Sequence, residues 1–303
     1  VKAQQLFEVN NYEDSYLGSA SIATATTYSD NSVYAELGLQ VGTENIAETA
    51  HAMGIETPIS TNPAMILGGL EQGVTPLNMA HAFQTLAHDG ERVSGTMAPT
   101  DGAPIAIQKV SDERPGTGGD VVETSTGDPG EDRVETEQVI SPEVAAQARS
   151  ILATVVSQGT GTNASTGATV EWGKTGTTEN NGDAWFVGAT EDVTIAVWVG
   201  HANSVKPMET EFGGAPVDGG TIPALIFHDV VLAFEQLSPD RPADEESTTD
   251  TPATASPTAP APAPAPTEPA PSETEGGSQA PPAESPPSGG GASGGTGGGV
   301  SPG

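Results

Sequence analysis

The strongest constraint on the fold is a block of three strand-like segments that follow one another at short intervals. They are ATVEWGKTGTT, DAWFVGAT and VTIAVWVGH, at residues 168–178, 183–190 and 193–201. β-Branched and aromatic residues are frequent in all three, and turns containing Asn181-Gly182 and Glu191-Asp192 separate them. Segments joined by such short turns pair as neighbours, so we expect an antiparallel meander. Apolar residues occupy both faces of the third segment, which predicts a sheet that is covered on both sides.

Amphipathic helices are predicted before and after this block, at residues 42–54, 75–90, 141–159 and 221–237. The pairs Thr75-Pro76 and Ser141-Pro142 mark two starts, because the hydroxyl accepts a hydrogen bond from a free backbone N–H and Pro needs no donor there. Thr43 is the expected cap of the first helix. The apolar stripe of the third helix is expected to contain Val144, Ala148, Ile151, Leu152 and Val155. The order of helices, strands and a final helix predicts an α+β domain with an antiparallel sheet flanked by helices.

Two stretches are too polar to form a core. Residues 98–138 are rich in acids, Gly, Thr and Pro, and we interpret them as a surface excursion with VVE (121–123) as its strand fragment. Residues 239–303 contain 15 of the 26 prolines, 11 of the 38 glycines and no aromatic residue. Such a composition cannot bury enough apolar surface to offset the entropy of ordering, so we expect a disordered tail. Fold and chemistry are therefore expected within residues 1–238.

Net charge and the lack of cysteine exclude several classes of function. The formal net charge is −32 at pH 7, and most of it lies ahead of the tail. Such a field repels nucleic acid and anionic membrane surfaces, so neither is an expected partner, and a high-salt habitat is one explanation of the charge. The absence of Cys excludes disulfides, thiolate catalysis and Cys-based zinc sites. No cofactor or metal is expected, since the histidines lack a ligand pattern.

Gly173-Lys174-Thr175 has the letters that end a phosphate-binding loop, but its setting differs from one. Such a loop requires five residues from its first glycine to the glycine before the Lys, whereas Gly167 stands six residues before Gly173. Bulky Trp172 occupies a position that needs a small residue. A strand turn follows rather than a helix, so no helix N-terminus is available to hold phosphate. The nucleotide interpretation fails, which leaves a substrate-binding strand or an ordinary exposed strand.

Other motifs decide between those two alternatives. Ser29-Asp30-Asn31 at the start of a helix and Lys174-Thr175-Gly176 on a strand both occur in the motif set of penicillin-recognising serine enzymes. Four longer segments then follow in order: SVYAELGLQVGTENIAETAHAMGI, LGGLEQGVTPLNMAHAFQTLAHDG, QVISPEVAAQARSILATVVSQGTGT and GKTGTTENNGDAWFVGATEDVTIAVWVGH. Over residues 9–235 the chain resembles the C-terminal two-thirds of the transpeptidase domain of class A penicillin-binding proteins.

The resemblance implies a serine D,D-transpeptidase that cross-links peptidoglycan stem peptides ending in D-Ala-D-Ala and that binds β-lactams. It implies that Lys174, Thr175 and Thr177 bind the C-terminal carboxylate of the substrate, while Gly176 leaves room for an extended peptide. The backbone N–H of Thr177 would form half of the oxyanion hole. Catalytic roles would fall to four residues, namely Ser29 as proton shuttle, Asn31 as holder of the substrate amide, Lys174 and Thr177.

One family motif does not occur in this chain. The nucleophile of the family is the Ser of S-x-x-K, but none of the four lysines has a Ser three residues before it. We therefore expect residues 1–238 to be a partial transpeptidase domain that is inactive alone. An upstream segment would then carry the nucleophile, a glycosyltransferase domain and the membrane anchor, with the protein on the extracytoplasmic face of the cell membrane.

Other functions stay open at this point. One is a non-catalytic relative that only binds peptidoglycan peptides. Another is a β-lactamase or D,D-carboxypeptidase, which uses the same residues with water as the acceptor. A third is a wall-spanning structural protein whose tail threads peptidoglycan, although that function leaves the K-T-G strand unexplained.

Overall fold

The computed structural model describes residues 8–11, 15–98, 100, 102–107, 109 and 132–237. The chain divides into two units, Val1–Ala243 and Asp244–Gly303, and all described residues belong to the first. The tail that the sequence predicts at 239–303 lies outside the described residues.

The described part is an α+β structure, as predicted. Its α-helices are α1 (Ile22–Tyr28), α2 (Asn31–Val41), α3 (Thr43–Ala52), α4 (Pro76–Ala87), α5 (Pro142–Gln158) and α6 (Ile222–Leu237). Its strands are β1 (Glu91–Gly95), β2 (Val134–Gln138), β3 (Trp172–Thr177), β4 (Asp183–Ala189) and β5 (Thr194–Gly200). Short 3₁₀ segments are η2 (Pro63–Leu67), η3 (Thr162–Ala164) and η4 (Glu179–Asn181). Among the described helices, none combines the length and the apolarity that crossing a bilayer requires.

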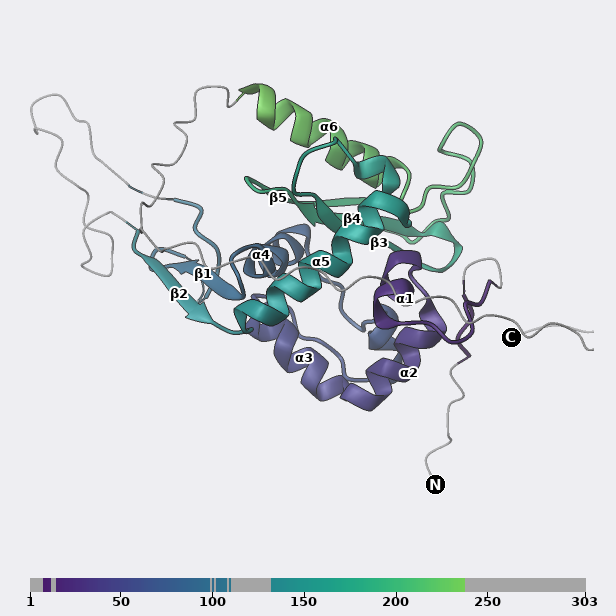
Figure 1. The fold of residues 1–303 in the computed structure, drawn as a ribbon, viewed down its shortest axis with the longest axis horizontal. Coiled ribbons are helices and arrows are strands. Elements are labelled where there is room, and N and C mark those ends of the chain that lie inside the picture. The colour runs from purple at the N-terminus through teal and green to yellow at the C-terminus, as the bar shows by residue number, and fades with distance from the viewer. Residues whose placement is uncertain are drawn as a thin grey trace, which may run out of the picture. The chain divides into compact units, whose positions relative to one another are not determined.

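The central sheet is the predicted meander, with the strand order β3-β4-β5 and antiparallel pairing throughout. Helices cover both of its faces (Figure 1). On one face Phe186 of β4 packs against Phe227 of α6, with ring centroids 4.8 Å apart. On the other face Trp172 of β3 stacks on Phe83 of α4, with centroids 5.7 Å apart. Packing between these aromatic rings joins α4 and α6 to the sheet.

The predicted helix starts are largely confirmed. The side chain of Thr75 accepts a hydrogen bond from Asn78 N, and that of Ser141 accepts one from Val144 N. The prediction for Thr43 was wrong, because Gly42 occupies the cap position of α3 and provides no side-chain cap.

The predicted apolar stripe of α5 was also wrong at its first member. Val144 is 55% exposed, whereas its neighbour Ala145 is fully buried. The cluster around Ala145 also contains Leu86 and Trp172. A small side chain lets α5 approach its neighbours closely, so Ala145 rather than the larger Val144 sets which side of the helix faces the core.

The polar excursion contains β2, which lies at a different place from the predicted strand fragment. β2 pairs antiparallel with β1 and is exposed along its whole length. The predicted VVE fragment at 121–123 lies outside the described residues.

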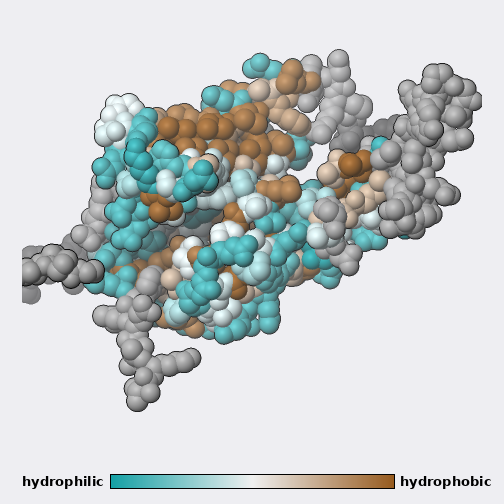
Figure 2. Space-filling view, turned by 180° about the vertical axis from the view of Figure 1, so that it is seen from behind, coloured by the Kyte–Doolittle hydropathy of each residue, from teal (hydrophilic) through white to brown (hydrophobic). Residues whose placement is uncertain are grey.

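Exposed apolar surface is found on α6. Figure 2 shows hydrophobic side chains gathered on the face where α6 lies, and this helix exposes Leu225, Ile226, Val230 and Leu237.

Candidate functional site

The S-D-N segment forms a sharp turn between two helices. Ser29 ends α1 in a left-handed backbone conformation (φ 56°, ψ 49°), which few residues other than Gly adopt. Asp30 then caps α2, since its Oδ1 accepts hydrogen bonds from Val33 N at 3.0 Å and from Ser32 Oγ at 2.7 Å. Burial raises the pKa of Asp30, but these hydrogen bonds outweigh that effect and hold the pKa below its usual value. The buried carboxylate therefore fixes the turn that presents Ser29.

The K-T-G segment forms the middle of β3, which has β4 as its neighbour among the described strands. Lys174 pairs with Val187, and Thr175 pairs with Phe186. Because side chains alternate along a strand, Lys174 lies on the face of the sheet that α4 covers. Thr175 and Thr177 lie on the opposite face, toward α6. The expected carboxylate-binding residues thus share one strand but belong to its two faces.

The backbone groups of Thr175 and Thr177 point to the edge of β3 that β4 does not pair. Thr178 N donates to Asp183 O at 3.1 Å, which sets the register at the end of the strand pair. In an antiparallel pair, every second residue of a strand directs its N–H and C=O toward the partner strand, and the residues between them direct these groups away from it. Thr178 bonds to β4, so Thr177 and Thr175 direct their backbone groups away from β4. The N–H of Thr177 is therefore directed to the same edge as the carbonyl of Thr175.

The two motifs, far apart in the sequence, meet through Lys174. Its Nζ donates to Ser29 Oγ at 2.8 Å, across a separation of 145 residues, and to Thr175 O at 3.0 Å. Burial lowers the pKa of Lys174 to about 8. A cation, a hydroxyl and an outward-facing strand edge thus occupy one place, which is an arrangement that can bind an extended peptide with a carboxylate.

The side chain of Asn31 does not hydrogen bond to Lys174 or to the threonines of β3. Its side-chain Nδ2 instead donates to Asn10 O at 2.9 Å, and the side chain is partly buried. At Gly176 the sheet surface is open, because a Cβ built there would meet only Trp185 Cβ, at 3.5 Å.

Two further residues that contact this strand were not predicted from the sequence. Thr160 Oγ1 lies 2.6 Å from Thr175 Oγ1, and Gly219 N donates to Thr177 Oγ1 at 3.0 Å. With its oxygen accepting from Gly219, the hydroxyl of Thr177 keeps its hydrogen for a ligand. In the sequence, Thr160 belongs to the string SQGTGT, which ends one of the four segments that carry the family resemblance.

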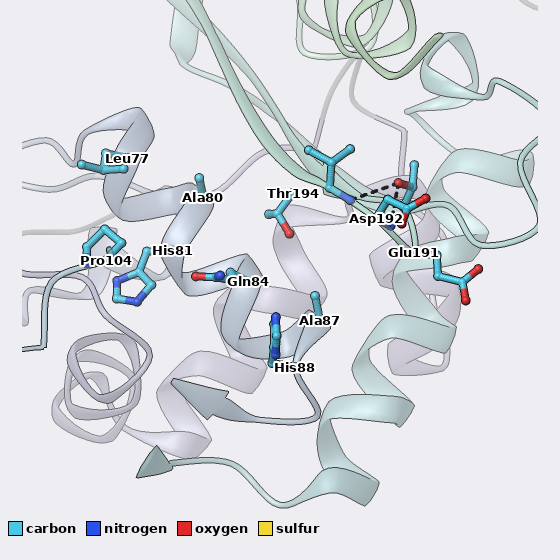
Figure 3. Close-up of a pocket in the computed structure, with 12 residues that line it drawn as sticks. Leu77, Ala80, His81, Gln84, Ala87, His88, Pro104, Glu191, Asp192 and Thr194 are labelled. Atoms are coloured by element: carbon cyan, nitrogen blue, oxygen red, sulfur yellow. Dashed lines mark hydrogen bonds between the residues drawn. The ribbon is translucent and has the colours of Figure 1, made fainter. Parts of the chain in front are cut away.

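A separate groove lies between α4 and the β4–β5 turn, and Figure 3 shows the side chains that line it. It encloses about 450 Å³ and contains none of the S-D-N or K-T-G residues. His81 is 2% exposed there, with its Nε2 hydrogen bonded to Val93 O at 2.7 Å, so it is a packed histidine. Within the described residues, no group of three His, Asp or Glu side chains could hold a metal ion.

Comparisons with known proteins show which proteins this chain is similar to. Residues 2–218 match the family described as the penicillin binding protein transpeptidase domain. Penicillin-binding protein 1F of Bacillus subtilis strain 168 is 31% identical over 227 residues, which are 73% of this chain and 28% of that protein. The solved structure of the penicillin-binding protein PonA1 from Mycobacterium tuberculosis is similar with a TM-score of 0.59 and 27% identity, covering 74% of this chain and 59% of that chain.

A second solved structure, of PonA1 from Mycobacterium tuberculosis in complex with penicillin V, is similar with a TM-score of 0.57 and 24% identity. The similarity covers 75% of this chain and 60% of that chain, and at this identity it shows only that the two share a fold. The chain spans about a quarter of the length of the curated relatives it matches.

Proposed function

Because the chain belongs to the penicillin-binding protein transpeptidase family, we propose that it forms the peptide-binding part of a serine D,D-transpeptidase site. The observation that carries the proposal is the 2.8 Å hydrogen bond from Lys174 Nζ to Ser29 Oγ. It joins the S-D-N turn to the K-T-G strand, so that a proton-transferring hydroxyl lies beside a substrate-binding cation. The substrates are peptidoglycan stem peptides ending in D-Ala-D-Ala, and β-lactams bind at the same place.

The extended peptide lies along the outer edge of β3. Its C-terminal carboxylate accepts hydrogen bonds from Lys174 Nζ and from the hydroxyls of Thr175 and Thr177, each of which is charge-assisted. Gly176 leaves space for the peptide backbone. The N–H of Thr177, which points to that edge, contributes to the oxyanion hole.

The reaction transfers an acyl group in two steps. A serine oxygen attacks the carbonyl carbon of the penultimate D-Ala while the serine proton passes to the lysine of the S-x-x-K segment. The C–N bond of the D-Ala-D-Ala amide then breaks, and a proton is delivered to the nitrogen of the terminal D-Ala, which leaves as an amine. The amine of a second stem peptide then attacks the ester and regenerates the serine. Ser29 passes a proton to the leaving amine and takes one from the attacking amine, while Lys174 stays protonated and holds the carboxylate. Asn31 holds the substrate amide once its side chain is released from Asn10.

The nucleophile of this proposal is the Ser of an S-x-x-K segment outside residues 1–303, because no Ser within them stands three residues before a Lys. The 303 residues alone are therefore inactive. The missing motif also supports a second function, a non-catalytic relative that binds stem peptides without cleaving them. In the first case the protein works on the extracytoplasmic face of the membrane, anchored by its upstream segment.

Labelled penicillin tests the proposal. The 303-residue chain should form no covalent adduct, and a protein extended upstream through its gene should form one at the Ser of the added S-x-x-K, located by mass spectrometry of the tryptic peptide. Lys174→Ala in the extended protein should slow the acylation, because a hydrogen bond to a charged group contributes about 1.5–3 kcal/mol. Lys206→Ala, which changes a lysine outside the site, is the matched control.

The possible results separate the two functions. An adduct on Ser29 of the 303-residue chain would contradict the assigned roles. Acylation at an unchanged rate in Lys174→Ala would remove Lys174 from the site. An extended sequence without S-x-x-K that still binds stem peptides would establish the non-catalytic function.

A further inference from the structure

The loop that follows α5 is fixed against the end of α1. A Cβ at Gly159 would lie 2.2 Å from the carbonyl oxygen of Thr27, so no larger residue fits there. The next residue, Thr160, donates its backbone N–H to the same oxygen at 3.2 Å. Thr27 stands two residues before Ser29. The position of Thr160 is therefore tied to the helix end that presents the S-D-N turn.

Two other glycines constrain the loop from the remaining sides. A Cβ at Gly161 would lie 2.9 Å from the ring of Phe186, in the core beneath the sheet. A Cβ at Gly220 would lie 2.3 Å from the carbonyl oxygen of Thr160. These close contacts at Gly159, Gly161 and Gly220 leave the backbone of Thr160 little freedom, so the direction of its side chain is set by packing.

The hydroxyl of Thr160 is directed at β3. Its Oγ1 lies 2.6 Å from Thr175 Oγ1, and Lys174 Nζ approaches the same Thr175 oxygen at 3.4 Å. An ammonium group only donates hydrogen bonds, so the Thr175 oxygen is an acceptor toward Lys174. When Thr175 gives its single hydrogen to a carboxylate, the hydrogen bond between the two hydroxyls requires Thr160 as the donor.

We propose that Thr160 is a positioning residue of the carboxylate-binding site: its hydroxyl donates to Thr175 and turns the hydrogen of Thr175 toward the C-terminal carboxylate of a bound peptide. The inference rests on the proposed function, and it adds a residue from a third segment of the chain to the S-D-N and K-T-G segments. Thr160 is exposed, so a ligand on β3 can approach this pair of hydroxyls.

The experiment compares two ligands on the 303-residue chain by NMR titration: N-acetyl-D-Ala-D-Ala and its C-terminal amide. The unchanged chain should bind the acid more tightly than the amide. Thr160→Val keeps the shape but removes the hydroxyl, and it should reduce that preference about two- to tenfold, the change in affinity that one hydrogen bond gives. Thr160→Ser should retain the preference. Thr162→Val, at another exposed threonine of the same loop, is the matched control.

A preference that stays unchanged in Thr160→Val, while Lys174→Ala abolishes it, would overturn the role of Thr160 and leave the proposed function intact. Equal weakening of both ligands in Thr160→Val would show a merely structural role and would also overturn it. No preference for the acid in the unchanged chain would overturn the carboxylate site and this inference with it. Should Thr160→Val fail to fold, Thr160→Ala removes the same hydroxyl without a branched side chain.

Discussion

The affinity for a peptide carboxylate should fall as the pH rises, and this fall should begin at an unusually low pH for a lysine. The reason is that Lys174 is buried. Burial disfavours the ammonium form and lowers the pKa from 10.5 to about 8. An ordinary exposed lysine stays charged to about pH 10. Only the charged form attracts a carboxylate, so the affinity should follow the protonated fraction of Lys174.

The size of the effect follows from the two pKa values. With a pKa of about 8, roughly nine-tenths of Lys174 is protonated at pH 7 and roughly one-tenth at pH 9, so the affinity should fall about tenfold. With the ordinary value of 10.5, the protonated fraction at pH 9 would stay above about nine-tenths and the affinity would be almost constant.

The titration of Lys174 does not itself weaken the fold as the pH rises. The folded-state pKa is lower than the unfolded one, so the unfolded chain binds more protons between about pH 8 and pH 10.5. The contribution of Lys174 to the free energy of unfolding therefore rises with pH across that window, while binding falls. The opposite signs separate the two effects.

The assay is the same NMR titration of N-acetyl-D-Ala-D-Ala between pH 6.5 and 9.5, with the C-terminal amide as the ligand control. The chain has four lysines, so ¹³C signals of their side chains can be followed directly and assigned to Lys174 with Lys174→Ala. Lys174→Arg keeps its charge at all these pH values and should abolish the pH dependence. Constant affinity up to pH 9 in the unchanged, folded chain would refute the reasoning.

Three further predictions concern the turn, the glycine contact and the tail. Asp30→Ala should lower the free energy of unfolding, measured in urea, by about 0.5–2 kcal/mol, because α2 loses its cap. Asp30→Asn can still cap the helix and should lower it by less, so equal losses in the two variants would contradict the capping role. Gly219→Ala should lower the free energy of unfolding in urea by about 1–3 kcal/mol, since its methyl group would lie 2.3 Å from the carbonyl oxygen of Trp185. Gly73→Ala is the control, because a methyl group there would meet no atom within 4 Å. Deletion of residues 239–303 should leave the thermal unfolding midpoint unchanged, and a large drop would show that the tail packs on the fold.

The sequence by itself determined the features that depend on neighbouring residues. Alternation and short turns predicted the meander, and the Thr75-Pro76 and Ser141-Pro142 pairs located two helix starts, because caps and turns are settled within a few residues. The order of motifs also indicated the family, which the match over residues 2–218 confirms.

The family resemblance placed the S-D-N and K-T-G motifs in one site, but tertiary structure alone decided which of their atoms make contact. The contact of Lys174 with Ser29 spans 145 residues, and the hydroxyl pair of Thr160 and Thr175 joins a loop to a strand. Neither pair has a local signal, because both depend on how α1 and α5 pack beside the sheet. The first residue of the core-facing stripe of α5 was likewise misjudged, since close packing favoured small Ala145 over the larger Val144. Local preferences set the elements of this protein, and packing between distant segments built its site.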